Sequence, residues 1–350
     1  MARTTIGLDI GTTAVRAAEL KLGDPPTLTR FAQLSLPPGA VLNGEISEPE
    51  TVSGVIRDLW RRGEFKGRRV AIAVANQNVI VRPVDLPQMD EEELRGALQF
   101  QVADYIPIPI EEALLDFLIL DEFMTEEGDA MMRVLAVAAQ KEMISQFVQT
   151  VTGAGLEPVA IDVGPLAALR AVADPTPPLL EERAAEAIID IGGGITDVVV
   201  HERGAPKLVR ILLSGGNDLT QALATELNMD LEDAEREKIT IGLQPEGQPI
   251  AAGAATIIES RARSFIDDVR RSLEYYRTQP DALPIARVTV IGGGSRLPRL
   301  AERLATALHV PVEEGRALDH IKVADLGLTA EQLDQVAVVA SIAIGLGMET

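Results

Sequence analysis

The chain of 350 residues contains no cysteine. This absence excludes disulfide bonds, thiolate catalysis and zinc sites built on cysteine, and it is typical of a reducing compartment such as the cytoplasm. Histidine is also scarce, and the three histidines, His201, His309 and His320, are scattered along the chain. We therefore expect no metal site built from histidine side chains.

Basic residues are few relative to acidic ones: 32 Lys and Arg stand against 53 Asp and Glu, which gives a formal net charge of −21. Binding to a phosphate backbone needs a Lys and Arg surface that releases counterions, so nucleic acid is not expected as a partner. The same electrostatic argument disfavours direct adsorption to an anionic membrane. A membrane location would therefore have to come through a protein partner.

Long hydrophobic runs are missing as well. The longest uncharged apolar stretch near the end, residues 336–348, has 13 residues, short of the roughly 20 that span a bilayer, and it predicts a buried helix. At the beginning, Asp9 interrupts the chain before an apolar segment as long as that of a signal peptide can form. We expect a cytoplasmic protein that does not insert into the membrane.

The composition that remains is that of a folded globular protein, with 46% apolar and 24% charged residues. Two segments, 6–18 and 187–200, share the order strand, Asp, glycine turn and strand, and their aspartates Asp9 and Asp190 lie 181 positions apart. This internal repeat predicts two halves that begin with the same hairpin. A proline-rich stretch at 174–183 separates them.

These features predict an α/β protein with a first domain at 1–173, a linker at 174–185 and a second domain at 186–350. Within the first domain, residues of about 79–154 follow the order strand, helix, strand, strand and form an expected inserted subdomain. Its strands are expected near 79–86, 114–123 and 131–138. The second domain alternates strands and helices.

Each repeated turn carries groups suited to phosphate. The glycines let backbone N–H groups converge on an anion, and the aspartate before them can hold a hydrated cation. Thr12, Thr13 and Thr196 add hydroxyl groups. A plain β-hairpin with a glycine turn explains either motif alone, but two such turns together with Asp197 favour a phosphate site.

A third glycine-rich stretch, residues 288–298, is expected to run from a strand through a loop into a helix whose first N–H groups face an anion. It is not a dinucleotide fingerprint, because the final glycine of that motif is missing. A P-loop is also excluded, since no glycine in the chain is followed by lysine.

Two Asp-x-Gly hairpins followed by a Gly-Gly-Gly loop resemble the actin-like ATPase superfamily of actins, sugar kinases and heat-shock chaperones. Within its FtsA-like branch, the chain is similar to the PilM family of type IV pilus assembly proteins. Three segments carry this narrower resemblance, which covers nearly the whole chain: 82–87, 105–107 and 270–277. It implies duplicated actin-like (ribonuclease H-like) domains with a nucleotide cleft between them.

The resemblance also implies a site for ATP or ADP with Mg. Asp9 and Asp190 would hold Mg through water, and Arg16 stands where the family usually has lysine. Glu235 and Lys238 would touch the ribose and adenine, although a solvated helix face is the favoured explanation of these two residues taken alone. The full set of implied nucleotide residues is Asp9, Gly11, Thr12, Thr13, Arg16, Asp190, Gly192, Gly193, Gly194, Thr196, Asp197, Gly215, Gly216, Asn217, Glu235, Lys238, Gly292, Gly293, Gly294, Ser295 and Arg296.

A catalytic base is not evident. Asp162 lies nearest to the position at which chaperone ATPases carry a water-activating carboxylate, but capping of the following helix explains it as well. We therefore predict a nucleotide binder with weak or no ATPase activity.

In function, the resemblance implies an adaptor on the cytoplasmic side of the inner-membrane platform of a type IV pilus or related type II secretion system. It would bind the N-terminal cytoplasmic tail of a PilN-like bitopic membrane protein, and pilus motor ATPases are further candidate partners. Two alternatives stay open: an FtsA-like cell-division protein that forms filaments, and a small-molecule kinase.

Overall fold

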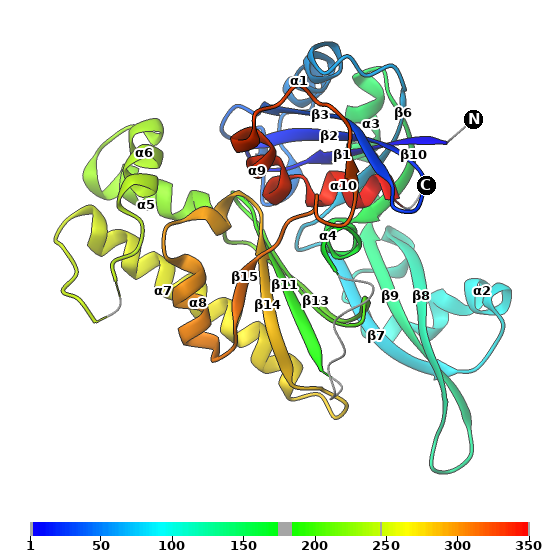
Figure 1. The fold of residues 1–350 in the computed structure, drawn as a ribbon. Coiled ribbons are helices and arrows are strands. Elements are labelled where there is room, and N and C mark those ends of the chain that lie inside the picture. The colour runs from blue at the N-terminus through cyan, green and yellow to red at the C-terminus, as the bar shows by residue number, and fades with distance from the viewer. Residues whose placement is uncertain (1–2, 174–183, 246, 349–350) are drawn as a thin grey trace.

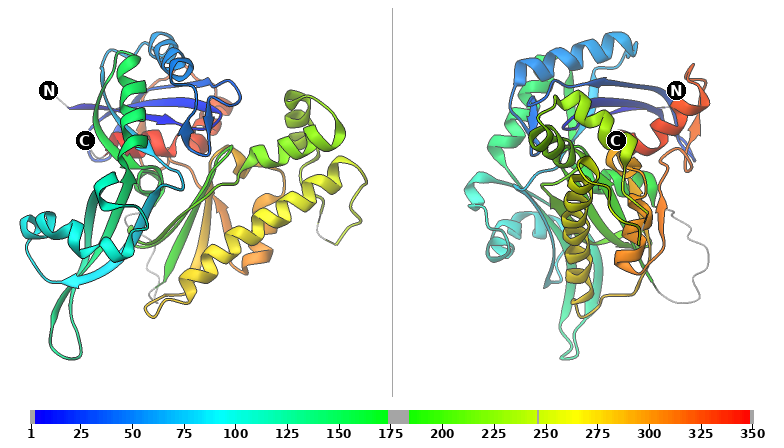
Figure 2. Two further views of the ribbon diagram at one scale, coloured as in Figure 1. Left: turned by 180° about the vertical axis from the view of Figure 1, so that it is seen from behind. Right: turned by 90° about the vertical axis from the view of Figure 1, so that its left-hand side faces the viewer.

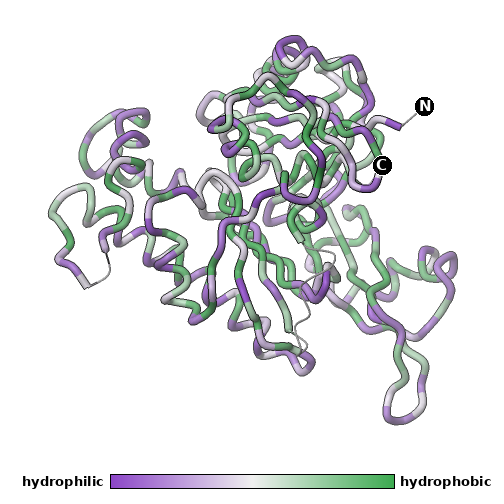
Figure 3. The backbone as a smooth tube through the Cα atoms, viewed as in Figure 1, coloured by the Kyte–Doolittle hydropathy of each residue, from purple (hydrophilic) through white to green (hydrophobic). Residues whose placement is uncertain are grey.

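The computed structural model describes residues 3–173, 184–245 and 247–348, and these form two α/β domains side by side with a smaller subdomain attached to the first (Figure 1). The linker expected at 174–185 lies outside the described residues except for 184 and 185. Hydrophobic residues follow the strands of both domains, whereas the outer turns are hydrophilic (Figure 3).

The first domain is built on a six-stranded sheet in the order β10-β6-β1-β2-β3-β16. Its central strands are hydrophobic along their length, and six of the seven residues of β1 are buried. The elements of this domain before the linker, apart from the inserted subdomain, are β1 (Thr4–Ile10), β2 (Ala14–Lys21), β3 (Thr27–Ser35), the small hairpin β4 (Val41–Leu42) and β5 (Glu45–Ile46), α1 (Pro49–Arg62), β6 (Arg69–Val74), α3 (Lys141–Gly153), β10 (Glu157–Val163) and α4 (Gly164–Val172).

The second domain repeats this plan in a five-stranded sheet, in the order β13-β12-β11-β14-β15. As β1 pairs antiparallel with β2 and parallel with β6, β11 pairs antiparallel with β12 and parallel with β14. Its elements are β11 (Ala185–Ile191), β12 (Thr196–Glu202), β13 (Ala205–Leu212), α5 (Gly216–Leu227), α6 (Leu231–Ile241), α7 (Ala254–Arg277), β14 (Ile285–Ile291), the 3-10 turn η3 (Gly293–Arg296), α8 (Leu300–Leu308) and β15 (Val312–Glu314). The repeat inferred from the two hairpins is therefore a repeat of the fold.

Helices cover the second sheet from both domains. Apolar residues of α5, α7 and α8 form one core with β11, β12 and β14, and the long helix α7 crosses this side of the sheet (Figure 2). On the opposite face, α4 of the first domain packs against β11 and β12. Because α4 follows β10 directly, it belongs to the first domain, and its contact with β11 and β12 joins the two domains.

The inserted subdomain has the predicted order of strand, helix, strand, strand. It contains β7 (Val79–Pro87), α2 (Glu91–Gln101), the short turns η1 (Ala103–Tyr105) and η2 (Ile110–Glu112), β8 (Ala113–Met124) and β9 (Ala130–Gln140). The strands form a separate sheet in the order β7-β9-β8, and α2 packs on one face over its own core. Helix α3, which the sequence boundary at 154 assigns to the insert, packs on α1 and β10 of the first domain as well as on β9 of the insert.

The C-terminal part of the chain returns to the first domain. β16 (Lys322–Val323) pairs in parallel with β3, and α10 (Ser341–Met348) packs against α4, β1 and β2, whereas α9 (Ala330–Val339) precedes it. Residues 322–323 and 341–348 therefore pack with the first domain, although the sequence places all of 186–350 in the second. The apolar stretch 336–348 is divided at Ala340 between two helices, and no helix of the described residues is long and apolar enough to cross a bilayer.

Candidate functional site

The turns of the two repeated hairpins meet between the domains. A Cβ atom placed on Gly193 would lie 2.6 Å from Cγ2 of Thr13, and one on Gly194 would lie 3.1 Å from Cγ2 and Oγ1 of Thr12. Each turn is closed by a backbone hydrogen bond, Gly11 N–H to Ala14 O at 3.0 Å and Gly192 N–H to Ile195 O at 2.9 Å. Together the turns border a cavity of about 260 Å³.

Carboxylates crowd one end of this cavity. Asp9 and Asp197 are 7% and 5% exposed, and Asp190 also lines the cavity. Burial raises the pKa of Asp9, whereas Arg16 lowers it through charge and a hydrogen bond from Nη1 to Oδ2 at 3.2 Å. Burial, together with the charge of Asp9, raises the pKa of Asp190 to about 7. Burial and the charges of Asp190 and Asp9 raise the pKa of Asp197 well above its ordinary range.

These carboxylates fit a hydrated divalent cation. Oδ1 of Asp197 is buried with no hydrogen-bond partner in the described structure. Arg16 lines the cavity together with the three aspartates and supplies a positive charge beside them. No group of three acidic or histidine side chains among the described residues could hold a metal ion directly. An Mg ion here would accordingly keep much of its water, which is its usual habit in proteins.

The loop before α5 braces the second turn. The N–H groups of Gly216 and Asn217 donate to the carbonyl oxygens of Gly192 and Gly193 at 3.0 and 2.7 Å. The hydroxyl of Thr196 donates to the carbonyl of Ser214 at 2.8 Å. Thr196 therefore supports the turn and does not line the cavity, whereas Asn217 does.

Lys238 on α6 joins the loop to a second cavity. Lys238 is buried, with 7% of the residue exposed. Its ammonium group donates to Gly216 O at 3.1 Å, Thr220 Oγ1 at 2.9 Å and Glu235 Oε2 at 2.7 Å. Beside Lys238 lies a mainly apolar cavity of about 340 Å³, lined by residues that include Leu219, Ile239 and Phe265. An apolar space next to a cavity lined by glycine turns and carboxylates suits a nucleoside.

The third glycine loop separates the two cavities. Gly292 has φ of 81°, and a Cβ atom there would clash with Oδ1 of Asp190, so only glycine lets this loop approach the carboxylate. The expected order of strand, loop and helix is present, with the 3-10 turn η3 at residues 293–296 between β14 and α8, which begins at Leu300. Anion binding by the N-terminus of α8 stays a prediction, and within the loop Gly292 N–H already donates to Val338 O at 3.0 Å and Ser295 N–H to Gly292 O at 3.2 Å.

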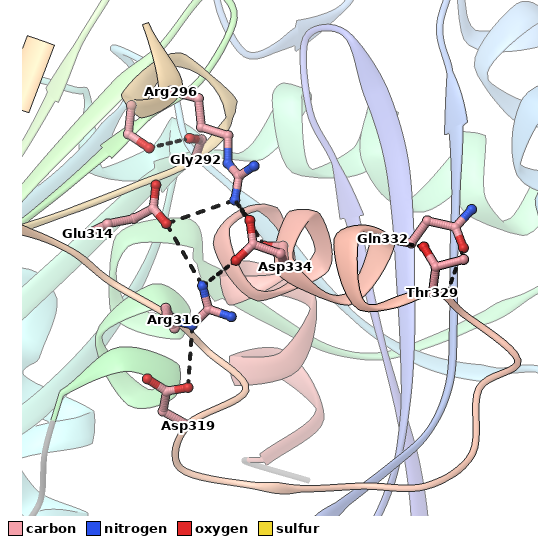
Figure 4. A network of polar contacts seen from close by, with 9 residues as sticks. Gly292, Arg296, Glu314, Arg316, Asp319, Thr329, Gln332 and Asp334 are labelled. Carbon is pink, nitrogen blue, oxygen red and sulfur yellow. Dashed lines mark hydrogen bonds and ion pairs between the residues drawn. The ribbon is translucent and has the colours of Figure 1, made fainter. Parts of the chain in front are cut away.

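Ser295 and Arg296 at the end of this loop are used in structural contacts. Ser295 Oγ donates to Gly292 O at 2.8 Å and is absent from both cavity linings. Arg296 lines the apolar cavity, but its Nη2 binds Asp334 Oδ2 on α9 at 2.5 Å, and Asp334 also holds Arg316 at 2.5 Å (Figure 4). The network ties the loop to α9, which precedes the helix packed on the first domain.

Most residues expected at a nucleotide site are brought together by the structure. Those lining the first cavity are Asp9, Gly11, Thr12, Thr13, Arg16, Asp190, Gly192, Gly193, Asp197, Gly216, Asn217, Glu235, Lys238, Gly292, Gly293 and Gly294. Gly215 lines the apolar cavity. Sequence reasoning missed Gly44, which lies in the turn between β4 and β5 and also lines the first cavity, although an Asn-Gly pair is a known hairpin signal.

Asp162, the candidate catalytic carboxylate, already forms hydrogen bonds within the first domain. Its Oδ1 accepts a hydrogen bond from the N–H of Val163 at 2.6 Å, and its Oδ2 pairs with Arg170 on α4. Asp162 is not among the residues that line the first cavity. Its contacts are those of a residue that anchors the start of α4.

Duplicated sheets, an inserted subdomain and paired Asp-x-Gly turns facing each other across a cavity define an actin-like ATPase fold. The chain belongs to the family of type IV pilus assembly protein PilM, whose family model matches residues 7–350. A solved structure described as the PilM-PilN type IV pilus biogenesis complex is 30% identical, with a TM-score of 0.84 over 99% of both chains.

More distant relatives share this fold. The cell division protein FtsA of Neisseria meningitidis serogroup B is 25% identical over 88% of this chain and 82% of its own length. FtsA of Bacillus subtilis is 23% identical over 68% of this chain, and the chain spans 58% of that relative's length. MreB5 of Spiroplasma citri, solved bound to ADP, is 17% identical with a TM-score of 0.51 over 98% of this chain and 94% of its own.

Proposed function

We propose that this protein is a nucleotide-binding adaptor of a type IV pilus assembly platform. It binds ATP or ADP with Mg between its two domains, and it binds the N-terminal cytoplasmic tail of a PilN-type membrane protein. The single observation that carries the nucleotide part is the meeting of two glycine turns, Gly11–Thr13 and Gly192–Ile195, at a cavity lined by Asp190 and by the buried Asp9 and Asp197. Binding of the tail would place the protein at the cytoplasmic face of the membrane.

The two adjoining cavities divide the nucleotide between them. Backbone N–H groups of the glycine turns and the guanidinium of Arg16 would hold the phosphates. Asp9 and Asp190 would hold Mg through water, and the positive charge of Mg would offset the negative charge of the three aspartates. The nucleoside would lie beside Lys238, Glu235 and the glycine loop, over apolar residues such as Phe265.

Hydrolysis would be weak. An efficient ATPase needs a group that positions or activates the attacking water, and Asp162 already accepts hydrogen bonds from Val163 and Arg170. A bound nucleotide would then act mainly by setting the conformation in which the protein meets its partner.

For the tail, the junction of the first domain with the insert offers apolar anchors. Leu114 and Leu118 on β8 are 46% and 50% exposed, and Val159 and Ile161 on β10 are 38% and 40% exposed. β10 is also an edge strand, so its free backbone groups can pair with an added strand. An extended tail would gain backbone hydrogen bonds from this edge and burial from these side chains.

Calorimetric titration of the full chain tests the two parts separately. MgATP and MgADP are titrated first, and Asp190→Ala is expected to abolish the Mg-dependent part of the affinity. A synthetic PilN-type tail is titrated next, with a scrambled peptide as control. Leu118→Asp and Ile161→Asp should each remove tail binding, whereas Leu227→Asp on α5, which also changes a partly exposed leucine, should not.

Results that contradict the proposal are specific to each part. Unchanged Mg-dependent affinity in Asp190→Ala would remove the nucleotide site from the cavity. Binding of native and scrambled tail alike would reject the partner. Pilus motor ATPases are further candidate partners, and they can be assayed by the same titration with the purified motor in place of the peptide.

A further inference from the structure

A second large groove lies between the inserted subdomain and the second domain, away from the nucleotide residues. It encloses about 880 Å³ and is lined by β7, β13 and the end of α7 with the residues that follow it. β7 and β13 are each the edge strand of their own sheet. The two edge strands also contact each other, and the end of α7 forms a further wall of the groove.

All three tyrosines of the chain line this groove. Tyr105 and Tyr275 are 44% and 56% exposed, whereas Tyr276 is buried. Aromatic residues make up only 3% of the sequence, so their gathering at one place is not an effect of composition. Tyrosine is enriched at protein interfaces because it combines a large apolar ring with a polar end.

The groove also has free positive charge, although the chain as a whole is strongly negative. Arg133 is satisfied by Asp85, at 2.6 and 2.8 Å, and by Asp281 at 3.1 Å. Arg82 on β7 and Arg210 on β13 form no ion pair within the described structure, and Arg210 lies over the ring of Tyr275 at 5.6 Å. Lys207 in the lining pairs with Glu202 at 3.7 Å, so among the described lining residues Arg82 and Arg210 are left to meet a negatively charged occupant.

A matching surface exists on the same protein. The hairpin of β8 and β9 projects from the inserted subdomain and away from the second domain (Figures 1 and 2). From residue 121 to 132 it has five carboxylates and no basic residue, and the carboxylates are Asp121, Glu122, Glu126, Glu127 and Asp129. At its tip, Met124 is 64% exposed.

The tip is an ordered turn. Thr125 N–H donates to Asp129 O at 2.9 Å, Gly128 N–H donates to Thr125 O at 3.0 Å, and Asp129 N–H donates to Thr125 Oγ1 at 3.1 Å. An ordered tip loses little conformational entropy on binding. Its exposed methionine can pack on tyrosine rings, a contact that sulfur favours.

We propose that the acidic tip of the β8–β9 hairpin of one molecule binds in the tyrosine groove of a second copy, between Arg82 and Arg210. The two surfaces are different patches, so the contact can be repeated head to tail from one molecule to the next. Repetition produces short chains, which close into rings where the rotation between molecules allows it. The contact uses neither the nucleotide cavities nor the apolar residues Leu118 and Ile161, so it stands apart from the proposed function.

Sedimentation velocity of the full chain over a concentration series at low ionic strength tests the contact. We expect the sedimentation coefficient to rise with concentration and to fall back on addition of salt, since exposed charges are screened. Arg82→Glu/Arg210→Glu in the groove and Glu126→Lys/Glu127→Lys in the hairpin should each remove the association. Arg61→Glu/Arg62→Glu at the end of α1 makes the same charge change elsewhere and should leave it intact.

Mixing gives the sharper result. The hairpin variant keeps a native groove and the groove variant keeps a native hairpin, so a mixture of the two should regain association that neither shows alone. A chain with all four substitutions should also regain it, because both charges are reversed. Circular dichroism of each variant confirms folding. A wild-type chain that stays monomeric at high micromolar concentration, or two folded variants that fail to complement, would overturn the proposal.

Discussion

Asp190 and Asp197 lie directly opposite each other on the antiparallel strands β11 and β12, and at the same place in the first hairpin Asp9 lies opposite Arg16. The two repeats thus keep one aspartate and differ in its cross-strand partner. In the first repeat the pair is an ion pair; in the second it is two carboxyl groups, of which that of Asp197 is buried. The negative charge that accumulates between the domains therefore comes mainly from the second repeat.

This arrangement predicts an unusual pH dependence of stability. The pKa of Asp190 rises from an ordinary 3.8 to about 7 on folding, because the group is buried and lies near Asp9. The folded state then binds more protons than the unfolded state between these values, so the free energy of unfolding falls as pH rises through that window. For this group alone, the fall from 3.8 to 7 is of the order of 4 kcal/mol.

Asp190→Asn should remove that contribution. Urea unfolding in EDTA should show the variant more stable than the wild type at pH 8, with the difference shrinking toward pH 4. Adding Mg at pH 8 should stabilise the wild type and leave the variant unchanged, because a bound cation favours the ionised carboxylates. Parallel pH profiles for the two proteins would contradict this account of Asp190.

Arg16 should matter for stability through Asp9. Both side chains are largely buried, at 14% and 11% exposure, and removal of one partner of a buried ion pair leaves the other charge uncompensated. We expect Arg16→Ala to lower the free energy of unfolding by about 3 kcal/mol at neutral pH. Urea unfolding measures the loss.

The matched double variant separates charge from packing. Asp9→Asn/Arg16→Ala has no charge left to compensate and should recover most of the lost stability. If the double variant is instead as unstable as the sum of both single ones, Arg16 acts by packing its side chain, which also donates to Gln33 at 3.0 Å.

Much of this site could be predicted from the sequence because its signals are local. Asp9 with Gly11 and Asp190 with Gly192 lie within short hairpins, and alternating apolar residues predict the strands around them. The actin-like fold and the PilM family were both confirmed. The nucleotide roles of the individual residues stay predictions.

What the sequence could not predict depends on contacts between distant parts of the chain. β16 is a strand of two residues, Lys322–Val323, with no pattern of its own, and it forms only because the first sheet offers β3 as a partner. The orientation of the Arg296 side chain also depends on a distant residue, because it binds Asp334 on α9. Gly44 was missed although its turn carries a local signal.

Contact between the two turns makes Gly193 a point at which domain closure can be tested. A methyl group there would lie 2.6 Å from Cγ2 of Thr13, far inside normal contact distance. Gly193→Ala should hold the turns apart and weaken MgATP binding by about tenfold, or about 1.4 kcal/mol. Calorimetry gives the affinity, and small-angle scattering shows whether the molecule opens.

Thr13→Ser supplies the control for that variant. Serine keeps the hydroxyl and lacks the obstructing methyl group, so Gly193→Ala/Thr13→Ser should bind MgATP more tightly than Gly193→Ala. Equal affinities would mean that the loss comes from the altered backbone of residue 193 and not from contact with the first domain.

The packing of α10 on the first domain depends on Gly345. A Cβ atom at this position would clash with the carbonyl oxygen of Ala167 in α4, and backbone cannot move aside as a flexible side chain can. We expect Gly345→Ala to lower the free energy of unfolding by about 3 kcal/mol, near the upper end for overpacked cores.

Gly96→Ala in α2 is the matched control, because a Cβ there meets no atom within 4 Å, and alanine should stabilise an exposed helix position by about 0.5–1 kcal/mol. Opposite signs for the same chemical change, measured by urea unfolding, would establish that close approach of α10 and α4 anchors the end of the chain to the first domain; a loss of stability in both variants would instead point to a general sensitivity of the fold.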